Sequence, residues 1–227
     1  SPSWGQIMNP NYRAMILEGK LTPVRELSAA FLTAGSDLEM QFAYYQSCLV
    51  VEFIVGRYGL DSLKQILLDL GRGVEINEAI AGHTEPMGAI ETAFEEYAKS
   101  KAGALGPGLE WDKPDPEEFN QALSGEAPEW LEKHSKNYYV LLQRARRWIE
   151  AKEWAQAKTA LETLVDRYPD QAGQGNAYSL LALVHQNLGD TGREQAVLKR
   201  LALQDADAVE AFARLMALAE QGGDWPG

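Results

Sequence analysis

Residues 43–59 read AYYQSCLVVEFIVGRYG, and this stretch decides the fold class. From Cys48 to Val55 it is apolar except for Glu52, and it is far shorter than a membrane span. Apolar residues recur here at three- and four-residue spacing, as they do through most of the chain, and Val, Ile and Thr never form an alternating strand run. The pattern therefore predicts an all-α protein.

Four helices are expected around this stretch, forming a helical bundle over residues 1–100. The first opens at Thr22-Pro23, which looks like an N-cap followed by a proline at the first helical position. The next runs from Asp37 to Gly59, where the missing Cβ suits a left-handed cap. The third covers 61–71 and the fourth about 87–98. The residues predicted to face inward are Val24, Leu27, Phe31, Leu32, Leu63, Ile66, Leu67 and Leu70.

Composition limits the classes of partner. The chain has 227 residues, 45% hydrophobic residues and a net charge of -12. This charge disfavours nucleic acid and anionic lipid, which both need clustered Lys and Arg, and it also favours solubility. The single cysteine, Cys48, rules out an intrachain disulfide and is expected in the core. Localisation stays open, although the first residues, SPSWGQ, lack the features of a signal peptide.

Residues 101–128 are rich in Pro, Gly and acidic residues and are expected to connect two parts of the chain. Prolines at this density interrupt helices, because each lacks an N–H and clashes with the preceding turn. The segment also contains Leu109, Trp111 and Phe119. We therefore expect a linker that these apolar side chains hold against a surface, rather than a free tether.

Residues 129–227 resemble two and a half tetratricopeptide repeats, in which small residues let paired helices touch and large ones fill the space beside them. The matching positions are Leu141, Ala145, Trp148, Ala157, Leu161 and Pro169; then Tyr178, Leu181, Ala182, His185, Gly189 and Leu198; then Phe212, Leu215, Met216 and Ala219 before GGDW (222–225). Arg144 replaces a usual leucine and Glu194 a usual alanine. The resemblance implies a short TPR-like α-α superhelix.

Such superhelices commonly bind a peptide or a partner helix on their concave face. The repeat pattern places seven residues on that face: Tyr139, Leu142, Arg146, Asn176, Ser179, Leu183 and Gln186. Arg144, Arg146 and Arg147 form a basic cluster, which a solvated helix face or pairing with the acidic linker would explain. Residues 109–119 could also lie across this face and block it. The expected partner is a protein or peptide.

No motif in the sequence assembles a catalytic or metal site. His83, His134 and His185 are scattered and belong to no HExxH helix, and His185 is best explained by packing in the second repeat. The chain also lacks a G-x-S-x-G turn, a Walker loop and a dinucleotide fingerprint. We therefore predict no metal ligand and no cofactor in this chain.

Three stretches of the first hundred residues carry a family resemblance: NPNYRAMILEGKLTPVRELSAAF (9–31), AYYQSCLVVEFIVGRYGLDSLKQILLDLGRGVEINEAI (43–80) and ETAFEEYA (91–98). Together they resemble the C-terminal helical part of peptidase MA-like zinc metallopeptidases, the gluzincins. The resemblance implies an HExxH helix upstream and zinc in a full-length protein. It also implies that Tyr44, which opens a Y-x-x-G-like pattern with Ser47 in place of glycine, stabilises an oxyanion. Tyr45 is the alternative, and both could be core aromatics.

Glu52 is expected to be a structural acid, because a buried unpaired carboxylate would cost several kcal/mol. Its expected partners are Arg25, Arg57 or a tyrosine hydroxyl. The chain is therefore interpreted as a non-catalytic fragment that binds proteins through its repeats. The alternative is the C-terminal part of an active zinc metallopeptidase whose HExxH motif lies upstream.

Overall fold

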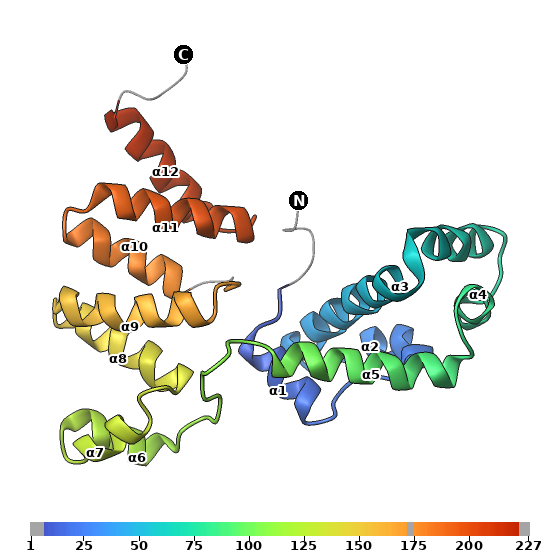
Figure 1. The fold of residues 1–227 in the computed structure, drawn as a ribbon, viewed down its shortest axis with the longest axis horizontal. Coiled ribbons are helices and arrows are strands. Elements are labelled where there is room, and N and C mark those ends of the chain that lie inside the picture. The colour runs from blue at the N-terminus through green and yellow to red at the C-terminus, as the bar shows by residue number, and fades with distance from the viewer. Residues whose placement is uncertain (1–6, 172–174, 223–227) are drawn as a thin grey trace. The chain divides into compact units, whose positions relative to one another are not determined.

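The structure, a computed structural model, describes residues 7–171 and 175–222 and is helical throughout (Figure 1). These described residues form twelve α-helices and no strand, apart from one isolated bridge between Glu110 and Asn137. The all-α prediction is therefore confirmed. The chain divides into two compact units between Leu105 and Gly106, here called the N-terminal and the C-terminal unit.

The N-terminal unit contains five α-helices and one 3₁₀ turn. They are α1 (Pro10–Leu17), η2 (Val24–Glu26), α2 (Leu27–Thr33), α3 (Asp37–Gly71), α4 (Ile76–His83) and α5 (Met87–Gly103). Helix α1 packs against α5, and α3 packs against α2, α4 and α5. The cap predicted at Thr22 is not formed. Instead, the buried amide of Gln46 donates from Nε2 to the Thr22 carbonyl (2.5 Å) and accepts from the Thr22 N–H (3.1 Å).

Helix α3 is one element with a kink at Gly59, where φ is 86° and ψ is 162°. Only glycine adopts this backbone conformation readily, so the break was predicted at the right residue. The geometry is a bend rather than the predicted left-handed cap, and helical residues continue beyond it. After the kink Ile66 is buried as predicted, whereas Leu67 is 57% exposed and was wrongly placed in the core.

Aromatic rings and aliphatic side chains build the core of the N-terminal unit. Tyr12 stacks on Tyr45 at 4.7 Å, and Phe53 lies 5.8 Å from Phe94 between ring centroids. Ile16 and Ile90 are fully buried. Large rings fill the space between the helices of this unit and contribute much of its buried apolar surface.

Two further residues predicted to be buried in this unit lie at the surface. Cys48 is exposed, and Leu32 is 89% exposed. Cys48 follows Tyr44 by four residues and precedes Val51 by three, so the three share one face of α3. That face is exposed, and an apolar run in the sequence does not distinguish it from the opposite, buried face.

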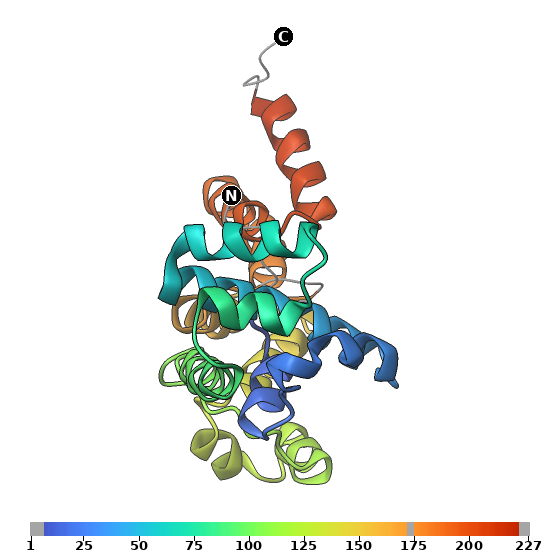
Figure 2. The same cartoon turned by 90° about the vertical axis from the view of Figure 1, so that its right-hand side faces the viewer.

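The C-terminal unit is a stack of helices in sequence order (Figure 1). They are α6 (Pro116–Ser124), α7 (Pro128–Lys133), α8 (Tyr138–Glu150), α9 (Trp154–Arg167), α10 (Ala177–Asn187), α11 (Thr191–Gln204) and α12 (Val209–Gly222). Each helix from α8 to α11 packs against the next one. Figure 2 shows α12, in red, at the end of this stack. The continuation predicted at GGDW lies mostly outside the described residues.

Small residues are buried in three successive helices of the C-terminal unit. Ala145 of α8 and Ala157 of α9 are fully buried, and Ala182 of α10 is 5% exposed. An alanine adds little bulk, so two helix backbones can approach closely at such a position. Buried alanines therefore occupy the predicted small-residue positions of α8, α9 and α10, whereas α11 has the buried Glu194 there.

The segment predicted to be a linker is ordered against the C-terminal unit. Trp111 stacks on Tyr138 (5.0 Å) and meets Tyr168 edge-on (5.7 Å). The Glu110 N–H donates to the Lys136 carbonyl (3.0 Å). Residues 116–133 then form α6 and α7, with Phe119 of α6 against Trp130 of α7. The expectation of a pinned segment agrees with these contacts, although part of the segment is helical.

Candidate partner-binding face

Helix α8 presents a row of three partly exposed side chains: Tyr139, Leu142 and Arg146. Their spacing of three and four residues places them on one face of the helix. The helix begins where it does because Asn137 caps it, accepting hydrogen bonds at Oδ1 from the N–H groups of Tyr139 (3.0 Å) and Val140 (3.2 Å). Asn137 is itself buried, so this cap fixes where the helix, and with it the row, begins.

Helix α10, which contacts α8, carries a second row formed by Ser179, Leu183 and Gln186. Leu183 is 40% exposed and Gln186 is exposed. Ser179 is partly exposed and donates from Oγ to the Asn176 carbonyl at 2.9 Å. The two rows together are called the α8–α10 face below: Tyr139, Leu142, Arg146, Ser179, Leu183 and Gln186.

Asn176 does not belong to this face, although the repeat pattern places it there. It is buried, and its Oδ1 accepts from the Ser179 N–H at 3.0 Å as the N-cap of α10. Asparagine is a preferred residue at this position because its side chain satisfies an N–H that the helix leaves unbonded. Asn176 is thus a helix cap, and we leave it out of the candidate face.

The arginines of α8 contact neutral groups instead of carboxylates. Arg146 donates from Nη2 to the Gly175 carbonyl (3.2 Å), and Arg147 donates from Nη1 to the Leu123 carbonyl (2.7 Å). The Arg144 guanidinium lies 4.7 Å from the centre of the Trp148 ring. Burial lowers the pKa of Arg144. Pairing with acidic side chains of the preceding segment therefore does not explain the basic cluster in the described structure.

Lys113 adds a cation at the Tyr139 end of the α8–α10 face. Its Nζ lies 5.9 Å from the centre of the Tyr139 ring, at the outer limit of a cation–π contact. The backbone beside it is fixed, because Asn137 donates from Nδ2 to the Asp112 carbonyl at 2.7 Å. The segment predicted to lie across the repeats therefore reaches this face at Tyr139.

The two tyrosines considered for an oxyanion role have opposite environments. Tyr44 is 53% exposed, and its ring meets Phe31 edge-on at 4.9 Å. Tyr45 is 3% exposed and donates from its hydroxyl to the Met8 sulfur at 3.4 Å. Burial raises the pKa of Tyr45 far above its ordinary value. Tyr45 is thus a core residue, and Tyr44 alone presents its ring at the surface.

Glu52 is a surface acid with two partners on α5. The Tyr97 hydroxyl donates to its Oε1 at 2.8 Å, and Lys101 Nζ lies 2.5 Å from the same oxygen. Partial burial raises the pKa of Glu52. The hydrogen bonds from Lys101 and Tyr97 lower it by more than burial raises it, so the net shift is downward. The expected tyrosine partner is confirmed, and the two arginine partners are wrong.

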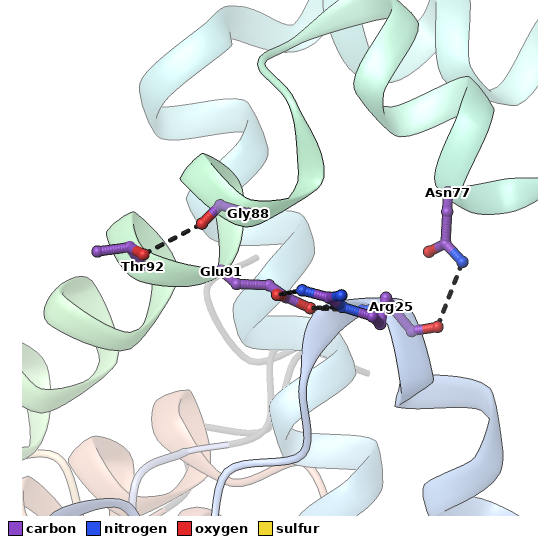
Figure 3. A network of polar contacts seen from close by, with 5 residues as sticks. All are labelled: Arg25, Asn77, Gly88, Glu91 and Thr92. Carbon is purple, nitrogen blue, oxygen red and sulfur yellow. Dashed lines mark hydrogen bonds and ion pairs between the residues drawn. The ribbon is translucent and has the colours of Figure 1, made fainter.

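Those arginines pair elsewhere in the N-terminal unit. Arg25 forms a bidentate ion pair with Glu91 of α5, and its backbone carbonyl accepts a hydrogen bond from Asn77 Nδ2 of α4 at 3.3 Å (Figure 3). These contacts connect η2 to α4 and α5. Arg57 pairs with Glu85 at 3.3 Å. These contacts connect helices and explain why neither arginine is available to Glu52.

The histidines lie in separate structural roles. His83 Nε2 lies 2.7 Å from Asp69, His134 Nδ1 lies 2.8 Å from the Trp130 carbonyl, and His185 is 2% exposed in α10. Within residues 7–171 and 175–222, no three His, Cys, Asp or Glu side chains are grouped so that they could hold a metal ion. No helix of the described chain is long and apolar enough to cross a membrane.

One cavity of about 310 Å³ lies beside α1, α2 and α3 in the N-terminal unit. Its polar lining is already engaged: Lys20 pairs with Glu18 at 2.7 Å, and Glu39 accepts from the Gly35 N–H at 2.6 Å. Binding sites usually converge several available polar groups on a ligand. We therefore assign no ligand to this cavity.

Comparisons with known proteins add no relative to this description. No protein-family model matches the chain, and neither the curated proteins nor the solved structures contain a significant match.

Proposed function

We propose that this chain is a protein–protein interaction module that binds a peptide or a partner helix on the α8–α10 face of a short tetratricopeptide-like superhelix. The observation that carries the proposal is the row of partly exposed apolar side chains, Tyr139, Leu142 and Leu183, on two adjoining helices. Solvent-exposed apolar rows of this kind bind partner helices by burying apolar surface.

Hydrogen bonds to buried side chains at the starts of both helices support the proposal. Both helices of the face begin at a buried asparagine cap, and the buried amide of Gln171 connects α9 to the start of α10. Its Nε2 donates to the Tyr168 carbonyl (2.8 Å), and its Oε1 accepts from the Ala177 N–H (3.1 Å). A preordered surface loses less conformational entropy on binding, which favours affinity.

The test is a peptide array probed with the chain and with two leucine variants. Leu183→Glu places a charge on the proposed face, whereas Leu203→Glu makes the same change on α11, where Leu203 is 74% exposed. We expect peptides that bind the unmodified chain to be lost with Leu183→Glu and retained with Leu203→Glu. Equal retention by both variants would contradict the proposed face.

A second candidate function follows from the resemblance to zinc metallopeptidases, and the exposure of Tyr44 favours it. An oxyanion-stabilising phenol must reach a substrate, which the exposed Tyr44 ring permits and the buried Tyr45 does not. The test is the Tyr44→Phe variant in a longer protein that contains an upstream HExxH helix. A loss of kcat with zinc content unchanged would support it, and full activity would exclude it.

A further inference from the structure

We propose that the partner of the α8–α10 face is an acidic helical segment, with two carboxylates one heptad apart and an apolar side chain between them. The inference rests on the proposed function and names the chemistry of its ligand. It starts from two cations: Arg146, at one end of the row on α8, and Lys113, which lies beside Tyr139 at the other end.

Helix α8 is a basic element in an acidic chain. It contains three arginines and one glutamate, whereas the whole chain carries a net charge of -12. Among the described residues, no carboxylate lies within ion-pairing distance of any of the three arginines or of Lys113. In the N-terminal unit, by contrast, Arg25, Arg57 and Lys101 all have carboxylate partners. The charge of the α8 row is therefore available to a partner.

The positions of these cations give the spacing of the partner's acids. Lys113 lies over the Tyr139 ring, and Arg146 lies seven residues further along α8, which corresponds to roughly 10 Å along the helix axis. Leu142 lies between Tyr139 and Arg146 in α8, and Leu183 is exposed in the row of α10, which contacts α8. A helix with acids at i and i+7 and leucines at i+3 and i+4 matches this order of charge and apolar surface.

Arg146 is held in place for such a contact. Its hydrogen bond to the Gly175 carbonyl uses one of its five N–H donors and fixes the guanidinium beside the start of α10. The positive end of the α10 dipole adds to the same local potential. A carboxylate bound here would meet a preoriented cation, which costs less side-chain entropy than a free one.

The experiment uses three synthetic 15-residue peptides on an Ala/Gln background, each labelled for fluorescence anisotropy. The acidic peptide has Glu at i and i+7 with Leu at i+3 and i+4. The shifted peptide has the same composition with the two Glu moved to i+2 and i+5. The basic peptide has Lys in place of both Glu. We expect the acidic peptide to bind tightest, and its affinity to fall as salt rises.

Variants of the chain localise the effect. Arg146→Gln and Lys113→Gln should each weaken the acidic peptide about fivefold, whereas Lys199→Gln, an exposed lysine of α11, should not change it. Arg146→Lys keeps the charge and should retain most of the affinity, which separates a charge effect from a disturbed Gly175 turn. An Arg146→Glu/Lys113→Glu double variant should prefer the basic peptide.

The other outcomes separate the two proposals. Equal binding of the acidic, shifted and basic peptides, abolished by Leu183→Glu, would overturn the acidic partner and keep the interaction module. Binding of the acidic peptide that Arg146→Gln and Lys113→Gln leave unchanged would also overturn the inference. No binding of any peptide here, together with no Leu183-dependent signal on the array, would overturn both proposals.

Discussion

The two units of this chain build their cores in different ways. In the N-terminal unit the centre of α3 is filled by rings, with Phe53 within 6.1 Å of Tyr58, Phe94 and Tyr97. In the C-terminal unit the fully buried side chains of α8 and α9 are aliphatic: Val140, Ala145, Ala157, Leu161 and Leu164. Removing one ring from the first arrangement disturbs several contacts at once, whereas the second divides its apolar surface among smaller side chains.

A comparison within the C-terminal unit shows how a departure from a repeat can be structural. Ala157 of α9 and Glu194 of α11 occupy the same position of the proposed repeat, and both are buried. Arg214 of α12 explains the difference: its Nε lies 2.5 Å from Glu194 Oε1, and its Nη2 lies 3.1 Å from Oε2. A buried acid is tolerated at this position because the following helix supplies a matching cation.

The largest effect is expected from Phe53→Ala in the N-terminal unit. Removing a buried ring that contacts three others should lower the free energy of unfolding of this unit by about 3–5 kcal/mol. Urea unfolding followed by far-UV circular dichroism should shift. Tryptophan fluorescence should shift less, since four of the six tryptophans, Trp111, Trp130, Trp148 and Trp154, lie in the C-terminal unit.

The matched variant is Leu161→Ala, because Leu161 is fully buried in α9. It should shift the unfolding transition followed by fluorescence to lower urea. The part of the circular dichroism transition that reports unfolding of the N-terminal unit should stay unchanged. If both variants moved both signals equally, the two units would unfold as one, and the contrast between their cores would have no thermodynamic counterpart.

Arg214→Met should have the next largest effect. It leaves the Glu194 carboxylate buried without its cation, which should cost the C-terminal unit about 3 kcal/mol. The double variant Glu194→Ala/Arg214→Met removes the buried charge and places an alanine in α11. It should recover most of the lost stability, as measured by fluorescence in urea. A double variant as unstable as Arg214→Met alone would show that the ion pair is not the cause.

Buried glutamine amides allow a direct comparison of the two units. Gln46 bonds the backbone of Thr22, and Gln171 bonds the backbone on both sides of the loop between α9 and α10. Gln46→Leu and Gln171→Leu should each cost about 2 kcal/mol, because backbone groups lose their partners inside the protein. Hydrogen exchange should rise locally at Thr22 in the first variant and at Ala177 in the second.

Helix content, the break at Gly59 and the buried alanines of α8, α9 and α10 could be predicted from the sequence, because residue spacing and the backbone freedom of glycine act locally. The exposure of Cys48 and Leu67 could not, since an apolar run shows no difference between its two faces until its neighbours are placed. The partners of Glu52 were missed in part for the same reason. Tyr97 and Lys101 lie four residues apart on α5, and only the crossing of α3 and α5 brings them to the acid.

The candidate face was predicted from repeat spacing, except for Asn176. An asparagine three residues before Ser179 is equally consistent with a helix cap, and the cap has the stronger local reason. Lys113 was missed because it lies outside the repeats, in a segment whose position depends on the stacking of Trp111. The signal that could have found it was the aromatic residue two positions earlier.

The smallest effect concerns His185, which gives the C-terminal unit a sensitivity to acid that the aromatic core of α3 lacks. Its ring is 2% exposed, and Nδ1 has no hydrogen-bond partner, the nearest carboxylate oxygen being that of Asp190 at 4.0 Å. Burial lowers the pKa of His185, and the nearby Asp190 offsets this only in part. The unfolded chain therefore takes up a proton at higher pH than the folded one.

Stability contributed by neutral His185 should be complete above the ordinary histidine pKa of about 6.5 and should fall as the pH drops from there to the lowered folded value. Urea midpoints followed by fluorescence at pH 7.5 and pH 5.0 should differ more for the unmodified chain than for His185→Leu, because leucine has no proton to bind. An equal difference in both proteins would assign the acid sensitivity to other groups, and the two cores would then respond to pH alike.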